Sequence, residues 1–248
     1  MISALAITYN EEHNIERFIK SLDFVDEIII VDSHSTDSTA EMAQDLGAKV
    51  IKRKFTNYSD QKNYALDQAK NNWVVFFDLD ETIPKSLAEE LKTVSQLPDN
   101  IVAYKVKREF YFMGKQIKYS GFQNDWVFRL FDKRHCKFND SPVHEQLLTN
   151  GPTARLENIS DHYTYKNFDH YNQKLTKYAK LQAEQLYKKN LRPNLYHFLF
   201  RPWYRFFHQY IIKLGFLDGK EGFILAYLNG FSVFKRYLQL WLMYRNID

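Results

Sequence analysis

Cysteine is almost absent from this sequence, which has 248 residues and a single cysteine, Cys136. One cysteine excludes an intrachain disulfide and a zinc site built on cysteines, and it favours a reducing compartment. Residues 1–12 contain no basic leader and turn acidic at Glu11, so we expect neither a signal peptide nor an anchor there. The best candidate for a membrane span, residues 223–234, is shorter than the roughly 20 residues required and contains Asn229. We therefore expect a cytoplasmic protein.

Two signatures of phosphate binding are also missing. The sequence has no GxGxxG motif after its first expected strand and no GxxxxGK[ST] motif, so neither a Rossmann dinucleotide fold nor a P-loop is supported. A protein that binds a nucleotide without these loops must hold the phosphates differently. A divalent cation that bridges carboxylates and a diphosphate is one such device.

Charge is distributed unevenly along the chain. Residues 1–164 hold 20 Lys+Arg against 25 Asp+Glu, a net −5, whereas residues 165–248 hold 14 against 5, a net +9. No Gly/Ser/Pro-rich linker separates the two parts. We therefore expect residues 1–164 to form one domain and residues 165–248 to form a basic, aromatic helical extension docked on it.

The first half of the chain alternates between strand and helix patterns. The expected strands are residues 2–8, 27–31, 49–52 and 73–77, and the expected helices are residues 12–22, 38–46 and 58–70. This order predicts an α/β fold, an open and mostly parallel sheet flanked by helices. Ligands of such sheets bind outside the carboxyl ends of the strands, where the polar clusters TYN, VDSHSTD and DLDE all fall.

The cluster DLDE places three acids in four positions directly after an apolar strand. Carboxylates this close repel one another, so they need solvent, hydrogen bonds or a cation. Asp78, Asp80 and Glu81 could therefore form a cation site. They could equally mark a helix start near Pro84, with Asp80 or Thr82 as the cap and Glu81 favoured by the helix dipole.

Four motifs in order, AITYNEEHNIERFIKSL, VDSHSTDSTAEMA, QKNYAL and FFDLDE, resemble the nucleotide-sugar-binding half of a family 2 glycosyltransferase with the GT-A fold. The later motifs DWVFRLF, VHEQL and FLDGKEGF resemble the lipopolysaccharide inner-core subgroup that adds β-glucose to a heptose. The resemblance implies an inverting, metal-dependent hexosyltransferase. It would move glucose from a UDP-sugar to the heptose of a lipopolysaccharide inner core, with Mg²⁺ or Mn²⁺ as the cofactor.

The resemblance also implies roles for single residues. The residues expected at the nucleotide and diphosphate are Thr8, Asn10, Glu11, Asp32, Lys62, Asn63 and Asp78. Of these, Asp32 would bind the uracil or ribose, and Asp78 would face the ribose as the first acid of the DxD motif. Asp80, the second acid, would ligate the metal.

Several of these positions also have plainer interpretations. His144 and His162 are candidates for third metal ligands or diphosphate contacts, although a lone histidine is more often only hydrogen-bonded. Lys62 could be a solvated charge on a helix. Asp37, beside Asp32 in the second motif, is better explained as the cap of the helix that follows it.

Inverting transfer also needs a base that takes the proton of the attacking hydroxyl. Asp125 and Glu145 are the two catalytic candidates. Asp125 precedes Arg129 by four residues, which resembles the acidic base and arginine of the family, although residue 124 is Asn where many relatives have Glu. Either acid could be structural instead, Asp125 through a pair with Arg129 and Glu145 by holding a loop. We favour Asp125.

The basic tail admits three interpretations. Its charge and aromatic residues would suit a nucleic-acid-binding protein. Its long apolar stretches, such as HFLFRPWYRFFHQYIIKLGF, are more typical of a helix surface that contacts a membrane. The aromatic residues could also form the core that packs the tail onto the sheet domain. We expect no nucleic acid, but a lipid-linked core oligosaccharide and the anionic surface of the inner membrane as partners, with another glycan or a protein as the alternative acceptor.

Overall fold

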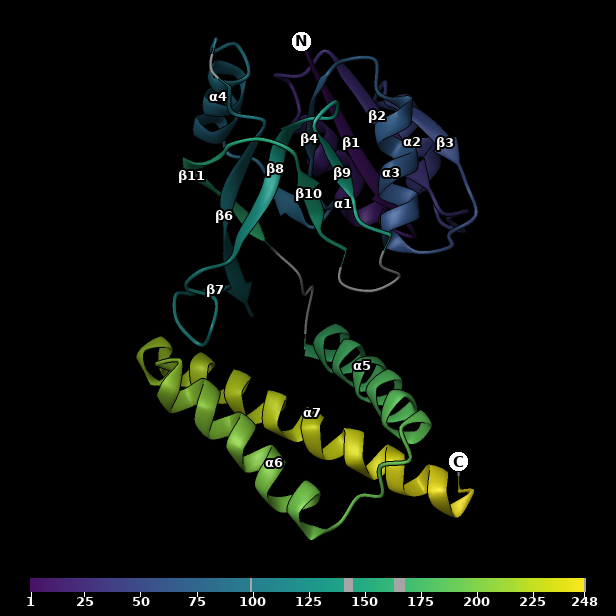
Figure 1. Cartoon of the computed structure of the whole chain (residues 1–248), viewed down its shortest axis with the longest axis vertical. Helices are drawn as coiled ribbons and strands as arrows, with labels where there is room; N and C mark the ends of the chain where they lie inside the picture. Colours follow the sequence, from purple (N-terminus) through teal and green to yellow (C-terminus); the bar gives the residue numbers. More distant parts are fainter. Residues whose placement is uncertain (99, 141–144, 163–167, 248) are drawn as a thin grey trace. The chain divides into compact units, whose positions relative to one another are not determined.

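The computed structural model describes residues 1–98, 100–140, 145–162 and 168–247. The chain forms two compact units (Figure 1). The first contains Met1–Arg108 and Asp125–His162, and the second contains Glu109–Asn124 and Tyr163–Asp248. The segment 109–124 thus belongs to the unit of the basic tail, which the charge distribution does not indicate. The boundary expected between residues 164 and 165 lies outside the described residues.

The first unit is built on a sheet with the strand order β3-β2-β1-β4-β8-β6-β11-β5. The parallel strands are β1 (Ile2–Thr8), β2 (Glu27–Asp32), β3 (Lys49–Lys52) and β4 (Trp73–Phe76). The strands β8 (Trp126–Asp132), β6 (Ala103–Phe112), β11 (Thr153–His162) and β5 (Glu81–Thr82) continue it. β8 runs antiparallel to both β4 and β6, and β5 runs antiparallel to β11. A separate pair joins β9 (Cys136–Phe138) to β10 (Leu147–Thr149).

Helices cover both faces of this sheet. They are α1 (Glu12–Lys20), α2 (Thr39–Asp45), α3 (Tyr58–Gln68) and α4 (Lys85–Val94). The side chains of the central strands alternate between the two faces, because successive residues of a strand point in opposite directions. Phe77 packs in a cluster with Phe18 of α1 and Leu87 of α4, whereas Phe76 packs with Leu66 of α3. The predicted α/β architecture, with a flanked open sheet and a C-terminal helical extension, is confirmed.

In its described residues, the second unit consists of helices and one short hairpin, the end of β6 paired with β7 (Lys115–Ile117). Its helices are α5 (Phe168–Lys188), α6 (Leu195–Phe207) and α7 (Gly219–Arg245), with the short turns η1 (His208–Ile212) and η2 (Gly215–Asp218) before α7. α7 packs along both α5 and α6 (Figure 1). Across the part of the chain that the structure describes, no helix has both the length and the apolar character needed to cross a bilayer.

The motif FLDGKEGF connects two segments of the second unit through hydrogen bonds and close packing. The Asp218 carboxylate accepts hydrogen bonds from the backbone N–H groups of Lys118 and Tyr119, at 2.9 and 3.1 Å, and from the Ser120 hydroxyl at 2.8 Å. A Cβ at Gly222 would lie 1.9 Å from the Gly215 carbonyl oxygen, so only glycine fits there. The motif therefore fixes residues 118–120 against the start of α7.

Candidate active site

The acids after β4 are neutralised mainly from within the chain. Arg129, on β8, places Nη2 2.8 Å from Asp78 Oδ2 and Nε 3.0 Å from Glu81 Oε2, and Nη2 also pairs with Glu81 Oε1. Its Nη1 donates to the Phe76 carbonyl oxygen at 3.0 Å. Glu81 is fully buried and Arg129 nearly so. Two of the three acids in DLDE are thus paired with Arg129, Glu81 in the interior and Asp78 with a side chain that is 37% exposed, and they do not depend on a bound metal for neutralisation.

The interpretation of these acids as a helix start is wrong. Glu81 and Thr82 form β5, in which Glu81 pairs with His162 of β11. α4 begins at Lys85 with Pro84 as its N-cap, and no side chain caps it. The positive charge that stabilises the Glu81 carboxylate is the guanidinium group of Arg129 and not the dipole of a helix.

A second arginine, Arg108, extends this network to the candidate base. Its Nε and Nη2 bind the two carboxylate oxygens of Asp125 at 3.0 and 3.1 Å, and its Nη1 lies 3.3 Å from Glu81 Oε1. Asp125 therefore pairs with Arg108, and the structural alternative of an Asp125–Arg129 pair is wrong. Each oxygen of Asp125 keeps a second lone pair that a hydroxyl proton can approach.

The network shifts the pKa values of Asp78 and Glu81 in opposite directions. Burial favours the neutral form of Asp78, but Arg129, with Lys62 and Arg108, outweighs it and lowers the pKa of this carboxyl well below its usual range. Burial raises the pKa of Glu81, against the opposing effect of Arg129. Asp78 therefore carries a full negative charge at neutral pH.

Asp80 and His162 are the groups that fit a divalent cation. Asp80 Oδ2 lies 3.2 Å from His162 Nε2, and Asp80 Oδ1 is buried with no hydrogen-bond partner in the described part of the chain. Ligand atoms of Asp80, Glu81 and His162 lie within 4.8 Å of one another, but Arg129 and Arg108 occupy the Glu81 oxygens. A carboxylate oxygen and an imidazole nitrogen are suitable ligands for Mn²⁺ and, for the oxygen, Mg²⁺. His144 lies outside the described residues.

A pocket of about 500 Å³ opens beside Asp78. Its lining includes the positive side chains of Lys62, Lys105, Arg108 and Arg129, and the acids Asp78 and Glu145. Lys62 is 7% exposed, and its Nζ lies 2.9 Å from Glu145 Oε1. The alternative that Lys62 is a solvated helix charge is therefore wrong. An excess of positive charge around an open pocket suits an anionic ligand such as a diphosphate.

The loops after β1 and β2 are held to each other. Asp32 is fully buried and accepts a hydrogen bond of 3.0 Å from the Ser35 N–H. Asn10, at a positive φ of 56°, accepts one of 2.8 Å from the Thr36 N–H. The buried Thr8 carbonyl accepts from the Ser33 N–H at 2.9 Å. Asp32 thus shapes the loop on which a nucleotide contact would depend.

Glu11, Asp37 and Asn63 of the N-terminal motifs take part in hydrogen bonds that involve backbone groups. The Glu11 N–H donates to Thr39 Oγ1 at 2.7 Å, and the Asp37 carboxylate accepts a 3.1 Å bond from the N–H of Thr39, the first residue of α2. Asp37 thus supports the start of α2, although the N-cap residue is Ser38 and not Asp37 as predicted. The Asn63 amide makes two bonds to the Phe138 backbone, one accepted at 2.8 Å and one donated at 2.9 Å. Asn63 therefore holds β9 against α3.

Sequence reasoning missed Arg108 and Lys105, and it gave Arg129 only a secondary role. One signal was available, since an arginine inside the apolar strand WVFRLF is rarely buried unless it is paired. For Arg108 we find no comparable signal, because its partners Asp125 and Glu81 are distant in the sequence.

The model of the family described as glycosyl transferase family 2 matches residues 3–148. The chain belongs to glycosyl transferase family 2. The assignment made from the four N-terminal motifs is thus confirmed, and with it the GT-A type of the fold. An uncharacterised glycosyltransferase of Rickettsia typhi is 30% identical over 251 residues, which cover 96% of this chain and 86% of that protein.

A lipopolysaccharide core biosynthesis glycosyltransferase of Rhizobium meliloti, LpsC, is 29% identical over 250 residues, which cover 95% of this chain and 93% of that protein. Among solved structures, the glucosyl-3-phosphoglycerate synthase of Mycobacterium tuberculosis, in complex with Mn²⁺, UDP and glucosyl-3-phosphoglycerate, is similar at 27% identity. Its TM-score is 0.39, with 45% of this chain and 44% of that chain covered.

The buried arginine of this family 2 member should be essential for stability. Arg129→Met leaves Asp78 and Glu81 without their main partner, and breaking a buried ion pair costs about 3–5 kcal/mol of unfolding free energy. Urea unfolding followed by circular dichroism measures the loss. The matched control is Arg134→Met, because Arg134 is 60% exposed in its pair with Asp132 and should change stability by no more than about 1 kcal/mol. Equal losses in the two variants would contradict the prediction.

Proposed function

We propose that this glycosyltransferase moves glucose from UDP-glucose to the heptose of a lipopolysaccharide inner core, with inversion at the anomeric carbon and with Mg²⁺ or Mn²⁺ bound. The observation that carries the proposal is the pair formed by Asp80 and His162, at an edge where the neighbouring Asp78 lines a pocket rich in positive charge. A nucleoside diphosphate sugar needs both features. Its diphosphate binds a cation and positive side chains, and its sugar needs open space.

Asp80 and His162 would hold the cation, which supplies positive charge to the departing UDP. Lys105 and Arg108 line the pocket and add positive charge from the protein. Lys62 can exchange its Glu145 partner for a phosphate oxygen, since both side chains line the same pocket. The ionised Asp78 keeps Arg129 in place across the end of β4.

Asp125 would remove the proton of the acceptor hydroxyl as it attacks the anomeric carbon. Its bond to Arg108 orients the carboxylate, and its side chain is 28% exposed, so a hydroxyl can reach it. Glu145 is the alternative base, although its oxygen Oε1 is engaged by Lys62. The acceptor class rests on the similarity to LpsC, which extends over almost the full length of both chains.

The direct test supplies purified protein with radiolabelled UDP-glucose, Mn²⁺ and heptose-terminated core oligosaccharide. We expect labelled product that is absent with EDTA and much reduced with UDP-galactose. A mass-spectrometric comparison of core oligosaccharide from cells with and without the gene should show one hexose fewer in its absence. Unchanged core oligosaccharide, together with no transfer in vitro, would contradict the proposal.

The helical unit would bring the enzyme to its lipid-linked acceptor. Many large apolar side chains of α6 and α7 are exposed, among them Leu199, Phe200, Trp203, Tyr227 and Phe231. An apolar helix face within a part of net charge +9 is typical of a protein that binds an anionic membrane surface. We therefore place the protein peripherally at the inner membrane.

We expect reversible binding to vesicles that contain anionic lipid, weakened by salt, and much less binding to neutral vesicles. Replacing Phe200 and Trp203 by Ser should weaken the binding about ten-fold or more, because the two side chains are 61% and 59% exposed and apolar burial is lost. The control replaces Phe55 and Leu97 by Ser, residues that are 42% and 48% exposed in the first unit. Vesicle sedimentation measures both. Equal losses in the two double variants would contradict the proposed surface.

A further inference from the structure

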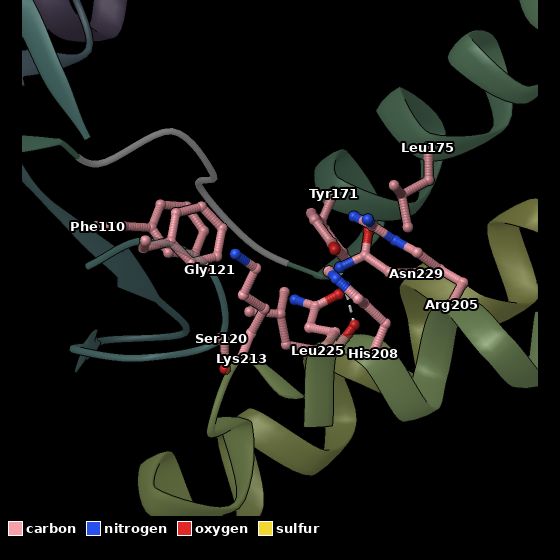
Figure 2. A pocket seen from close by; sticks show the side chains of 12 residues that line it. Phe110, Ser120, Gly121, Tyr171, Leu175, Arg205, His208, Lys213, Leu225 and Asn229 are labelled. Carbon is pink, nitrogen blue, oxygen red and sulfur yellow. Dashed lines mark hydrogen bonds between the residues drawn. The ribbon is translucent and has the colours of Figure 1, made fainter. Parts of the chain in front are cut away.

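Two adjoining cavities lie within the second unit. Their volumes are about 340 and 530 Å³, and both are lined by Leu175, Arg205, His208 and Asn229. Figure 2 shows the smaller one, in which Tyr171, Arg205 and Asn229 converge from α5, α6 and α7. We call the two cavities together the helical groove. Its walls come entirely from residues of the second unit.

The helical groove concentrates positive charge. Its basic residues are Arg201, Arg205, His208, Lys213 and Arg236. Among the described residues, no Asp or Glu lines either cavity, and none of these basic side chains forms an ion pair. The contrast with the first unit is clear, because there each arginine of the acid network faces a carboxylate.

Arg201 and Arg205 act unfavourably on the third arginine of the groove, Arg236. Burial, and then the charges of Arg201 and Arg205, lower the pKa of Arg236 despite the opposing effect of Tyr237. The Nε of Arg236 is buried without a hydrogen-bond partner in the described chain, whereas Arg201 Nε donates to the Tyr237 hydroxyl at 3.2 Å. Like charges in such a place are stabilised by a bound anion, and arginine matches the geometry of phosphate best.

The groove also contains a buried hydrogen-bond acceptor, Gln209 Oε1, to which no group of the described chain donates. Gln209 is 3% exposed, lines the smaller cavity, and its Oε1 has no hydrogen-bond partner in the described residues. A buried carbonyl oxygen without a partner costs about 1–3 kcal/mol, and a hydroxyl group satisfies it. Phe110 and Phe122, whose rings stack at 4.1 Å, provide a flat apolar wall of the same cavity. Hydroxyls, an apolar face and a negative group together describe a phosphorylated sugar.

We infer that the helical groove binds a phosphorylated saccharide, with Arg205 and Arg236 at the phosphate and Gln209 at a ring hydroxyl. A lipid phosphate shares the anionic chemistry but offers Gln209 no ring hydroxyl. The apolar groove lined by Pro202, Trp203 and Phe206 is a separate hollow of the same unit and is better suited to acyl chains. A role as an acceptor subsite rests on the proposed function, whereas the binding itself does not.

The test is calorimetric titration of the full-length protein with glucose 6-phosphate, glucose, inorganic phosphate and a short-chain phosphatidic acid. We expect glucose 6-phosphate to bind most tightly and glucose not to bind. The double variant R205Q/R236Q should lose about ten-fold or more in affinity, because charge-assisted bonds to the phosphate are removed. Gln209→Leu should weaken the binding of glucose 6-phosphate but leave that of phosphate unchanged.

Arg192→Gln is the matched control, since Arg192 is exposed on the same unit and lines neither cavity. Far-UV circular dichroism of each variant reports whether the helices of the second unit are folded. Undiminished affinity in R205Q/R236Q overturns the inference. Tighter binding of phosphatidic acid, insensitive to Gln209→Leu, also overturns it and assigns the groove to a lipid headgroup. Failure of glucose transfer with groove binding intact would count against the proposed function alone.

Discussion

Asp80→Asn should abolish sugar transfer, by more than about 10³-fold in turnover, and should remove the metal-dependent part of UDP binding. The Asp80 side chain is 25% exposed, and its buried Oδ1 has no partner in the described chain. Asparagine keeps the shape but replaces one anionic oxygen with an NH₂ group, which cannot ligate a hard cation. Because Arg129 binds Asp78 and Glu81 rather than Asp80, the fold should remain intact.

Steady-state transfer with saturating UDP-glucose and Mn²⁺ gives the turnover, and calorimetry with and without EDTA gives the metal-dependent part of UDP binding. The matched control is Asp67→Asn, an exposed aspartate on α3 that should behave as the wild type. His162→Gln should weaken metal binding without abolishing transfer, since the carboxylate ligand remains. The metal assignment would be wrong if Asp80→Asn kept a near-normal turnover, or if EDTA left the turnover of the native enzyme unchanged.

Asp125→Asn should lower the turnover about 10³-fold while UDP-glucose still binds, which is within the range contributed by a general base. Glu145→Gln should lose less, because Glu145 pairs with Lys62 and its loss leaves the base in place. Both variants are measured at saturating donor. The opposite ranking would transfer the role of base to Glu145.

The bidentate pair with Arg108 means that Asp125 could also act by positioning this arginine. Arg108→Gln separates the two roles. If Asp125 only positions Arg108, both single variants and the double variant lose activity equally. If Asp125 is the base, Asp125→Asn loses far more turnover than Arg108→Gln at saturating donor. Equal losses in the two single variants would count against the base.

The parallel half of the sheet could be predicted because its strands are continuous apolar runs. Residues 73–77 have no polar interruption, and the structure buries Phe76 and Phe77 on opposite faces. The strands β5, β9 and β10 could not be predicted, since they contain only 2, 3 and 3 residues. Such short strands exist only through their pairing, as Glu81 of β5 pairs with His162 of β11 and β9 pairs with β10.

Ion-pair partners were the weakest part of the sequence interpretation. Asp125 and Arg129 are four residues apart, which would bring them together on a helix. Arg129 lies on a strand, where four residues span about 13 Å at roughly 3.3 Å each, so its side chain reaches the acids after β4 instead. The burial of Asp32 and the bonds of Asn63 to Phe138 depend in the same way on contacts that spacing along the chain does not reveal.

The contacts of the motif FLDGKEGF have a consequence for how homologues are classified. Gly222 is required by the Gly215 carbonyl, and Asp218 by the amides of Lys118 and Tyr119 and the hydroxyl of Ser120, so selection on these positions acts on folding whatever sugar is transferred. A search with this motif would therefore collect proteins with the same scaffold and different acceptors. Residues such as Gln209 and Arg236, which line the helical groove, are the positions at which diverging substrate preferences should be sought in an alignment.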